Sequence, residues 1–334
     1  MSLLSYVIRR VFQFIPMVAI TSILIYFIIE LPPGDYLTMH IIQLENQGNI
    51  ISETEIARLK DQYGLDKPLY VRYLRWVWNI LRYGDFGRSF DLSKPVSQVI
   101  GQRIVLTMVI SLFSLVFVWL VAIPIGIYSA VRQYSALDYG FTFLGFIGLA
   151  IPDFLLALVL VYISFRYFEN PITGLFSPEY LDAPWSWLKV VDMLRHVWVP
   201  VIVIGMGGTA SLIRITRGTL LDELRKPYVM TARAKGVNET KLLLKYPVRI
   251  AFNPLISTIG WLLPSLVSGT AITSIVLNLP TMGPVLLDAL LAQDMYLAGS
   301  FMLILSVLTM VGTLLSDILL ALVDPRIRYG GVSE

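Results

Sequence analysis

The chain has 334 residues, of which 56% are hydrophobic and 15% charged, and its mean hydropathy is +0.71. Soluble proteins carry roughly 25% charged residues, so this composition excludes a soluble domain and indicates a membrane protein. The absence of cysteine excludes disulfides, thiolate catalysis and Cys-ligated metal. The two histidines, His40 and His196, are far apart in the sequence, so no cofactor or metal is expected.

The first apolar segment, Val11–Ile29, has no charged residue and follows Arg9 and Arg10. A helix needs about 20 mainly apolar residues to cross a bilayer. A cleaved signal peptide would have an apolar core of about 7–15 residues and a small-residue cleavage site. This segment is longer and ends in Glu-Leu-Pro-Pro-Gly, so we predict that residues 1–30 form a cytoplasmic end and an uncleaved first transmembrane helix.

Residues 31–103 are rich in charge and are predicted to form an extracytoplasmic helical insertion. The sequence Ser52-Glu53-Thr54-Glu55 has the form of a capping box, which predicts a helix from there to Gly64. A second helix, about Pro68 to Tyr83, carries five aromatic residues. This density is typical of a helix at the membrane–water interface, but a small subdomain with an aromatic core explains it equally well.

Five further apolar segments follow, at Ile104–Val131, Tyr139–Phe165, Val197–Ile213, Leu255–Ile275 and Ala298–Val323. They predict a core domain of five transmembrane helices over residues 104–325, followed by a cytoplasmic tail at 326–334. The expected fold is therefore an all-α integral membrane protein with six transmembrane helices and an insertion after the first.

The distribution of basic residues predicts the orientation, because Lys and Arg are enriched in short cytoplasmic loops. The stretch Arg214–Arg249 holds nine basic and three acidic residues, whereas no Lys or Arg occurs between Arg249 and Arg326. The loop Val276–Leu297 is therefore expected outside. Arg132, in a short connection, is expected inside, and both termini are predicted to be cytoplasmic.

The basic loop 217–254 also has a local helical pattern. Pro227 has the fixed φ that suits the first position of a helix. Gly236 is suited to the left-handed conformation that ends one, and Asn238 can cap a second helix that begins at Glu239. A compact pair of basic helices on the cytoplasmic side indicates a docking surface for a partner, although positive-inside charge alone also places basic residues there.

The stretch Pro227–Pro254 is similar to the cytoplasmic EAA coupling loop of ABC importer permeases, in the form found in dipeptide and oligopeptide permeases. The family pattern has an E-A-A triplet that ends four residues before a glycine. Here the triplet is Met230-Thr231-Ala232, so only its last alanine matches, while Gly236 is in place. The other matching residues are the string Ala232-Arg233-Ala234-Lys235-Gly236 and Arg249, Ala251 and Pro254.

Shorter motifs elsewhere resemble the same family, so the resemblance covers nearly the whole chain. They are Tyr63-Gly64-Leu65-Asp66-Lys67-Pro68, Gly87-Arg88-Ser89-Phe90, Ile123-Pro124-Ile125-Gly126, Ile151-Pro152-Asp153-Phe154 and Asp324-Pro325-Arg326-Ile327-Arg328.

The resemblance implies a type I ABC importer permease in a bacterial or archaeal plasma membrane. It implies a second homologous permease, two ATPase subunits and an extracytoplasmic solute-binding protein as partners, with the lipid bilayer around them and no nucleic acid. The chain itself is not expected to be an enzyme, because no Gly-Lys dipeptide and hence no Walker A sequence occurs. The resemblance assigns contact with the ATPase to Tyr228, Thr231, Ala232, Arg233, Ala234, Lys235, Gly236 and Arg249.

The solute is left open by the sequence, since members of this family carry peptides, nickel or oligosaccharides. Asp153 is a candidate for the translocation path, because a carboxylate in the middle of a span is costly unless it faces water or a partner. A structural carboxylate that binds backbone groups freed by Pro152 is the alternative. Asp317 is expected to be a helix-packing or surface carboxylate.

A self-sufficient channel or ion-coupled transporter is the alternative function. Such a protein should have charges in several spans or matching broken helices in two repeated halves.

Overall fold

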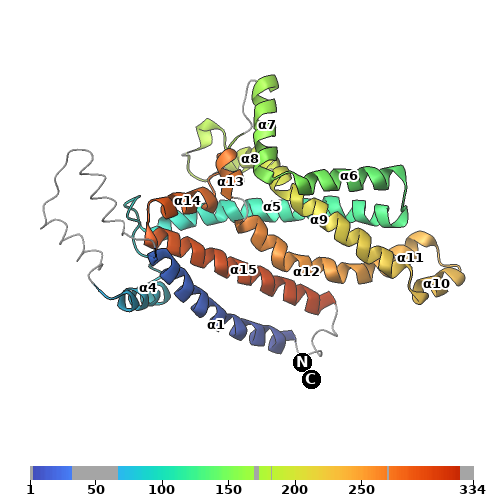
Figure 1. The fold of residues 1–334 in the computed structure, drawn as a ribbon, viewed down its shortest axis with the longest axis horizontal. Coiled ribbons are helices and arrows are strands. Elements are labelled where there is room, and N and C mark those ends of the chain that lie inside the picture. Colours follow the sequence, from blue (N-terminus) through green and yellow to red (C-terminus); the bar gives the residue numbers. More distant parts are fainter. Residues whose placement is uncertain (1–2, 32–66, 169–172, 182, 269–270, 324–334) are drawn as a thin grey trace, which may run out of the picture. The chain divides into compact units, whose positions relative to one another are not determined.

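The computed structural model describes residues 3–31, 67–168, 173–181, 183–268 and 271–323, and these residues are mostly helical (Figure 1). The long helices are α1 (Leu3–Glu30), α5 (Val96–Val131), α9 (Trp198–Leu224), α12 (Pro247–Ser268) and α15 (Met295–Val323). The shorter helices are α4 (Leu69–Tyr83), α6 (Ala136–Ala150), α7 (Asp153–Phe168), η1 (Pro178–Tyr180), α8 (Trp187–His196), α10 (Pro227–Ala234), α11 (Glu239–Lys245), α13 (Ala271–Val276) and α14 (Met282–Leu291).

The helices match most of the elements expected from the sequence. Five of those in the described part of the chain are long and apolar enough to cross a membrane, and a bent pair makes six if it counts as one span. Helix α4 confirms the helix expected at Pro68–Tyr83. The helix expected to begin at Ser52 lies outside the described residues.

The expected third span, Tyr139–Phe165, differs from a single straight helix. Helices α6 and α7 are bent by 100° at Ile151 and Pro152. Proline restricts the preceding residue to extended backbone, and Ile151 indeed has φ −91° and ψ 121°. A second difference concerns α9, which continues as one helix well past the expected end at Ile213, to Leu224.

The chain divides into two compact units, each described here by itself. The first comprises residues 1–11, 107–280 and 308–334, and the second comprises residues 12–106 and 281–307. In the first unit, α9 is central and packs against α6, α7, α8 and α12. Helices α5 and α9 approach closely at Gly126, where an added Cβ would lie 2.5 Å from Cβ of Thr216. Only glycine fits at such a contact.

The loop before α9 is held by buried polar side chains. The carboxylate of Asp192, on α8, accepts hydrogen bonds from the backbone N–H (2.8 Å) and the hydroxyl (2.6 Å) of Ser177. The ammonium of Lys189 donates to the carbonyl oxygen of Ala183 at 2.6 Å and lies 4.9 Å from the ring centroid of Phe176. These contacts compensate the burial of both charges.

In the second unit, α4 packs against α1 and α15 in a cluster around Tyr26, Trp76 and Leu303. Another cluster joins the start of α5 to α14 and α15. The buried carboxylate of Asp294, just before α15, accepts a 2.5 Å hydrogen bond from the hydroxyl of Ser89 and bonds from the N–H groups of Asp91 and Leu297. The Gly87–Phe90 motif is therefore attached to the N-terminus of α15.

Candidate functional site

The basic loop folds as the sequence indicates, into α10 and α11 with a tight turn between them. The turn is a Schellman motif: the N–H of Gly236 donates to the carbonyl of Arg233 at 3.0 Å, and the N–H of Val237 donates to that of Ala232 at 3.3 Å. Gly236 has φ +74°, a conformation that glycine adopts without steric cost. The side chain of Asn238 caps α11 by accepting from the N–H of Thr240 at 3.0 Å.

Each helix of the pair has one fully buried aliphatic side chain, Val229 on α10 and Leu242 on α11, and α11 packs against α12. The guanidinium of Arg233 binds the carboxylate of Glu239 in two places, at 2.5 and 3.1 Å, and so joins α10 to α11. The hydroxyl of Tyr228 donates to Glu223 at 2.6 Å. Burial and this hydrogen bond raise the pKa of Tyr228, so the hydroxyl keeps its proton and remains a donor.

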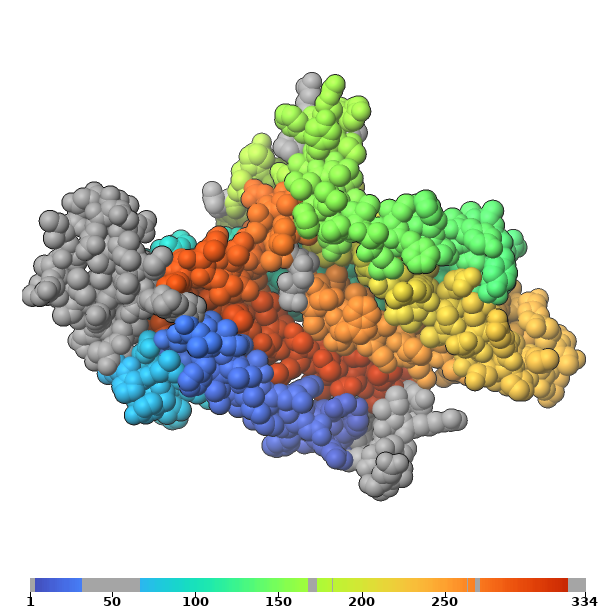
Figure 2. Space-filling view, viewed as in Figure 1, coloured from blue at the N-terminus to red at the C-terminus, as the bar shows by residue number. Residues whose placement is uncertain are grey.

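The helix pair lies between the C-terminal end of α9 and the N-terminal end of α12, and most of its side chains are exposed (Figure 2). Of the residues expected to contact an ATPase, Tyr228 and Ala232 are half-buried, and the exposed ones are Thr231, Arg233, Ala234, Lys235, Gly236 and Arg249. Arg249 lies on α12 and not on the short helices. Sequence analysis missed Met230 and Leu244, which are 63% and 61% exposed. Their exposure gives the basic surface an apolar component.

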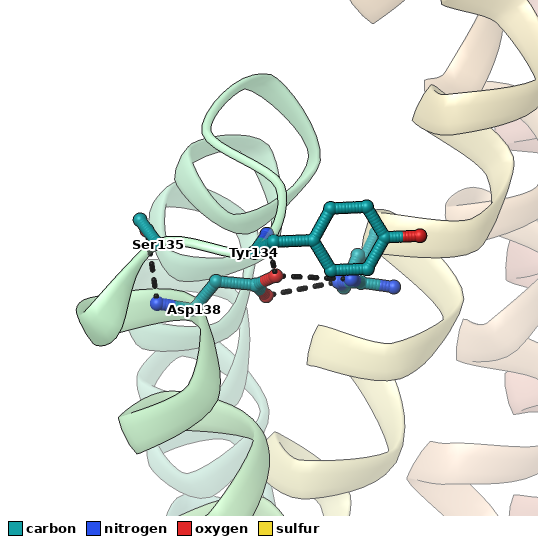
Figure 3. A network of polar contacts seen from close by, with 4 residues as sticks. Tyr134, Ser135 and Asp138 are labelled. Carbon is teal, nitrogen blue, oxygen red and sulfur yellow. Dashed lines mark hydrogen bonds and ion pairs between the residues drawn. The ribbon is translucent and has the colours of Figure 1, made fainter.

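A buried ion pair lies beside the start of this loop and was not expected from the sequence (Figure 3). Arg217, on α9, binds Asp138, on α6, through Nε to Oδ1 and Nη2 to Oδ2, both at 3.0 Å. Asp138 is only 2% exposed. It also accepts from the N–H of Tyr134 at 2.9 Å, and its own N–H is capped by the hydroxyl of Ser135 at 3.2 Å.

The ion pair fastens the α5–α6 turn to α9. Tyr134 in this turn has φ +66°, a left-handed conformation that is costly for a residue with a side chain. The bond from its N–H to Asp138 helps to hold that conformation. Because Arg217 lies ten positions before Pro227 in the sequence, the turn is attached to the segment of α9 that leads directly into α10.

Asp153 lies on the wall of an open cavity of about 400 Å³ within the first unit. The lining comes from the end of α6, the start of α7, and α9 and α12, and includes Gly207, Ser211, Trp261 and Ser265. An added Cβ at Gly207 would lie 3.6 Å from Oδ1 of Asp153, so the carboxylate lies next to the backbone of α9. The bend at Pro152 is what brings Asp153 to this wall.

The other acidic residue singled out in a span, Asp317, forms an ion pair with Arg10: its Oδ2 lies 3.0 Å from Nε of the arginine. Both residues belong to the first unit, where the pair connects α1 to α15. This contact agrees with the helix-packing role expected for Asp317.

Comparison with known proteins identifies the family of this chain. Residues 122–329 match the family described as "Binding-protein-dependent transport system inner membrane component". The chain is 35% identical to the oligopeptide transport system permease protein AppB of Bacillus subtilis (strain 168), over 97% of this chain and 99% of that protein. It is 32% identical to a putative peptide permease protein of Brucella suis biovar 1 (strain 1330), over 98% and 99%.

A third relative and one solved structure agree with this assignment. The inner membrane ABC transporter permease protein YejB of Escherichia coli O157:H7 is 30% identical over 98% of this chain and 99% of that protein. The inward-facing MetNI methionine ABC transporter has a chain that matches with a TM-score of 0.53 and 14% identity, over 68% of this chain and 97% of that one. The structural match shows the fold alone. The channel or ion-coupled transporter alternative is set aside, and the chain belongs to the inner-membrane components of binding-protein-dependent transport systems, as the transmembrane permease subunit of an ABC importer.

Proposed function

We propose that this permease carries peptides, and that the cavity beside Asp153 is part of their path. The observation that supports the solute class is the near full-length similarity to permeases named for peptides and oligopeptides. The cavity, at about 400 Å³, falls within the range of about 300–1,000 Å³ typical of small-molecule sites. A carboxylate on its wall suits the positively charged amino terminus of a peptide.

Within the complex, the chain pairs with a second, homologous permease and is served by two ATPase subunits and an extracytoplasmic binding protein. Both termini and the α10–α11 loop are cytoplasmic in this proposal. The pair of short helices docks in a cleft of one ATPase subunit through the exposed residues around Arg233, Lys235 and Gly236. Met230 adds an adaptable apolar contact, since methionine fills irregular surfaces well.

The Asp138–Arg217 pair gives this docking surface a mechanical connection to the path. Helix α9 leads into α10 at one end and lines the cavity with Gly207 and Ser211 farther along. Because the ion pair binds α6 to α9, a force on α10 moves both helices together. The wall of the cavity that carries Asp153, just after α6, then moves with the coupling surface.

The experiment that tests the proposal measures uptake by the full complex in proteoliposomes. Asp153→Ala is compared with Asp288→Ala, which removes an exposed carboxylate on α14 that does not line the cavity. Peptides with a free amino terminus and the same peptides acetylated at that position are offered with the cognate binding protein. Complex levels are matched.

The proposal expects Asp153→Ala to reduce uptake of free peptides more than that of acetylated peptides, with Asp288→Ala unchanged. Equal uptake in both variants would reject the role of Asp153. Transport of an oligosaccharide or nickel, with no peptide moved, would reject the solute class.

A further inference from the structure

Helix α4 has three distinct faces, and among the residues that the structure describes in the second unit, neighbours cover only one of them. The covered face contains Trp76, which is 3% exposed and packs against Tyr26 of α1. A polar face carries Arg75, Asn79 and Arg82. The third face is an uncovered apolar stripe, which we call the outer stripe: it consists of Tyr70, Leu74, Trp78 and Leu81, each between 57% and 78% exposed.

The spacing of the outer stripe, i, i+4, i+8 and i+11, places its members on one side of the helix. Arg82 borders the stripe, and its guanidinium lies 5.6 Å from the ring centroid of Trp78. Arginine and tryptophan side by side at the edge of an apolar face are typical of helices at the membrane–water interface.

The contacts of α4 with α1 indicate how deep the helix lies. Val11–Ile29 is uncharged, and its 19 residues extend about 28 Å as a helix, close to the roughly 30 Å of the bilayer core. In the orientation proposed above, Glu30 therefore marks the outer boundary, where it forms a 2.8 Å ion pair with Arg72 of α4. The hydroxyl of Tyr73 is 2.8 Å from that of Ser22, which lies about 12 Å further along α1, toward the bilayer centre.

Helix α15 gives the same depth independently. Trp76 lies next to Gly299 and packs with Leu303, about 6 and 12 Å from the start of α15 at Met295. The covered face of α4 thus contacts both helices inside their outer ends. Figure 1 shows α4 beside that end of α1. A neighbouring part of α1 is also apolar and uncovered, with Leu24 and Ile28 each more than half exposed.

We propose that the outer stripe of α4 lies against the acyl chains of the outer leaflet, so that α4 is an interfacial helix embedded at the rim of the permease. Its polar face, with Arg75 and Arg82, reaches the headgroups and the water beyond. The occupant of the stripe is phospholipid. In water, a stripe of four large apolar side chains would be an aggregation liability, whereas at this depth it continues the lipid-facing surface of α1.

The test uses the absence of cysteine from the chain, which makes single-cysteine labelling specific to the chosen position. Leu74→Cys and Leu81→Cys report on the outer stripe, Arg75→Cys reports on the polar face, and Leu24→Cys is the lipid-exposed reference. Each full-length variant is labelled with a bimane fluorophore and reconstituted, in the assembled complex, in vesicles of phosphatidylethanolamine and phosphatidylglycerol. Unsubstituted chain gives the background.

Two quenchers then separate the environments: a lipid with a nitroxide near the glycerol end of its acyl chain, and aqueous iodide. We expect the outer-stripe labels to be quenched by the lipid as strongly as Leu24→Cys, with a lipid-to-iodide quenching ratio several times that of Arg75→Cys. Strong quenching by iodide would overturn the proposal by placing the stripe in water. Protection from both quenchers would overturn it by showing that protein covers the stripe.

Discussion

The most informative substitution in this permease is Asp138→Asn, because it preserves size and removes only the charge that holds Arg217. Asparagine offers one oxygen where the carboxylate offers two, and its NH2 group faces the guanidinium. Removing one partner of a buried ion pair costs about 3–5 kcal/mol. The side chain of Arg217 is 27% exposed, so water compensates part of the loss and we expect a cost near the low end, about 3 kcal/mol.

This cost should appear as local opening of the α5–α6 turn and not as unfolding of the complex. A change of 1.4 kcal/mol is tenfold in an equilibrium constant, so about 3 kcal/mol corresponds to about a 100-fold larger open population. The one remaining oxygen must now serve both the guanidinium of Arg217 and the N–H of Tyr134, so the hold on the left-handed residue weakens at the same time. Amide hydrogen exchange should therefore accelerate by about 100-fold in residues 131–139, with little change in α12.

The functional readout is the amount of solute moved for each ATP hydrolysed. If the ion pair connects the docking surface to the cavity, Asp138→Asn should lower this ratio while ATP hydrolysis continues. Asp317→Asn is the matched control, because it breaks another ion pair of the first unit, the one with Arg10. We expect the control to leave the ratio unchanged.

A double-mutant cycle with Arg217→Gln decides whether the effect comes from the pair. Residues that interact directly give a non-additive result, so the double variant should open the turn little more than either single variant. Additive effects on exchange, or a normal transport ratio together with a fully opened turn, would refute the reasoning.

Three further predictions follow from other parts of the chain. The Gly236→Val complex should assemble but lose uptake, and its ATP hydrolysis should be lost or no longer be stimulated by loaded binding protein. No atom lies within 4 Å of an added Cβ at Gly236, so the main cost comes from φ +74°, at about 1–2 kcal/mol. Normal coupled transport by this variant would refute the proposed coupling role of the α10–α11 turn. Reporter fusions after Lys241 should report a cytoplasmic position, and fusions at Gln293 should report a position outside the membrane. A cytoplasmic report at Gln293 would contradict the predicted orientation of the spans. Burial alone would raise the pKa of Asp192, but the hydrogen bonds from Ser177 outweigh it and lower the pKa in the folded protein. The carboxylate therefore stabilises the loop at pH values above its unfolded pKa of about 3.9, and this stabilisation is lost as the pH falls from there through the lower folded pKa. An acid-active protease should therefore cut residues 177–196 only at low pH, and Asp192→Asn should remove the pH dependence.

Helices α10 and α11 could be predicted to the residue because their limits depend on local chemistry. Pro227, Gly236 and Asn238 each act on backbone groups within four positions of themselves, and the structure confirms all three roles. The same locality explains why α4 was predicted correctly as a helix while its environment was left open. A pattern of aromatics records which side chains are apolar, but not which of two apolar faces another helix covers.

The bend between α6 and α7 shows the limit of reading a single apolar segment. The sequence marks Pro152 as a breaker, but a proline inside a transmembrane helix is compatible with anything from a slight kink to a complete turn. The angle depends on packing of α6 and α7 against α9. Asp153 could therefore be selected as a costly mid-span charge, whereas its place on a cavity wall required the bend.

The Asp138–Arg217 pair was missed because its members are 79 positions apart, and either charge alone resembles an ordinary residue near the end of a span. A usable signal was nevertheless present. The orientation deduced from the Lys/Arg distribution places the turn before Asp138 and the loop after Arg217 on the same side of the membrane. Charges near the ends of apolar helices need partners, and those partners must lie at the same depth. The partner of Asp138 must therefore be one of the few basic residues at the same depth on that side of the membrane. The contact of α6 with α9 then selects Arg217 among them.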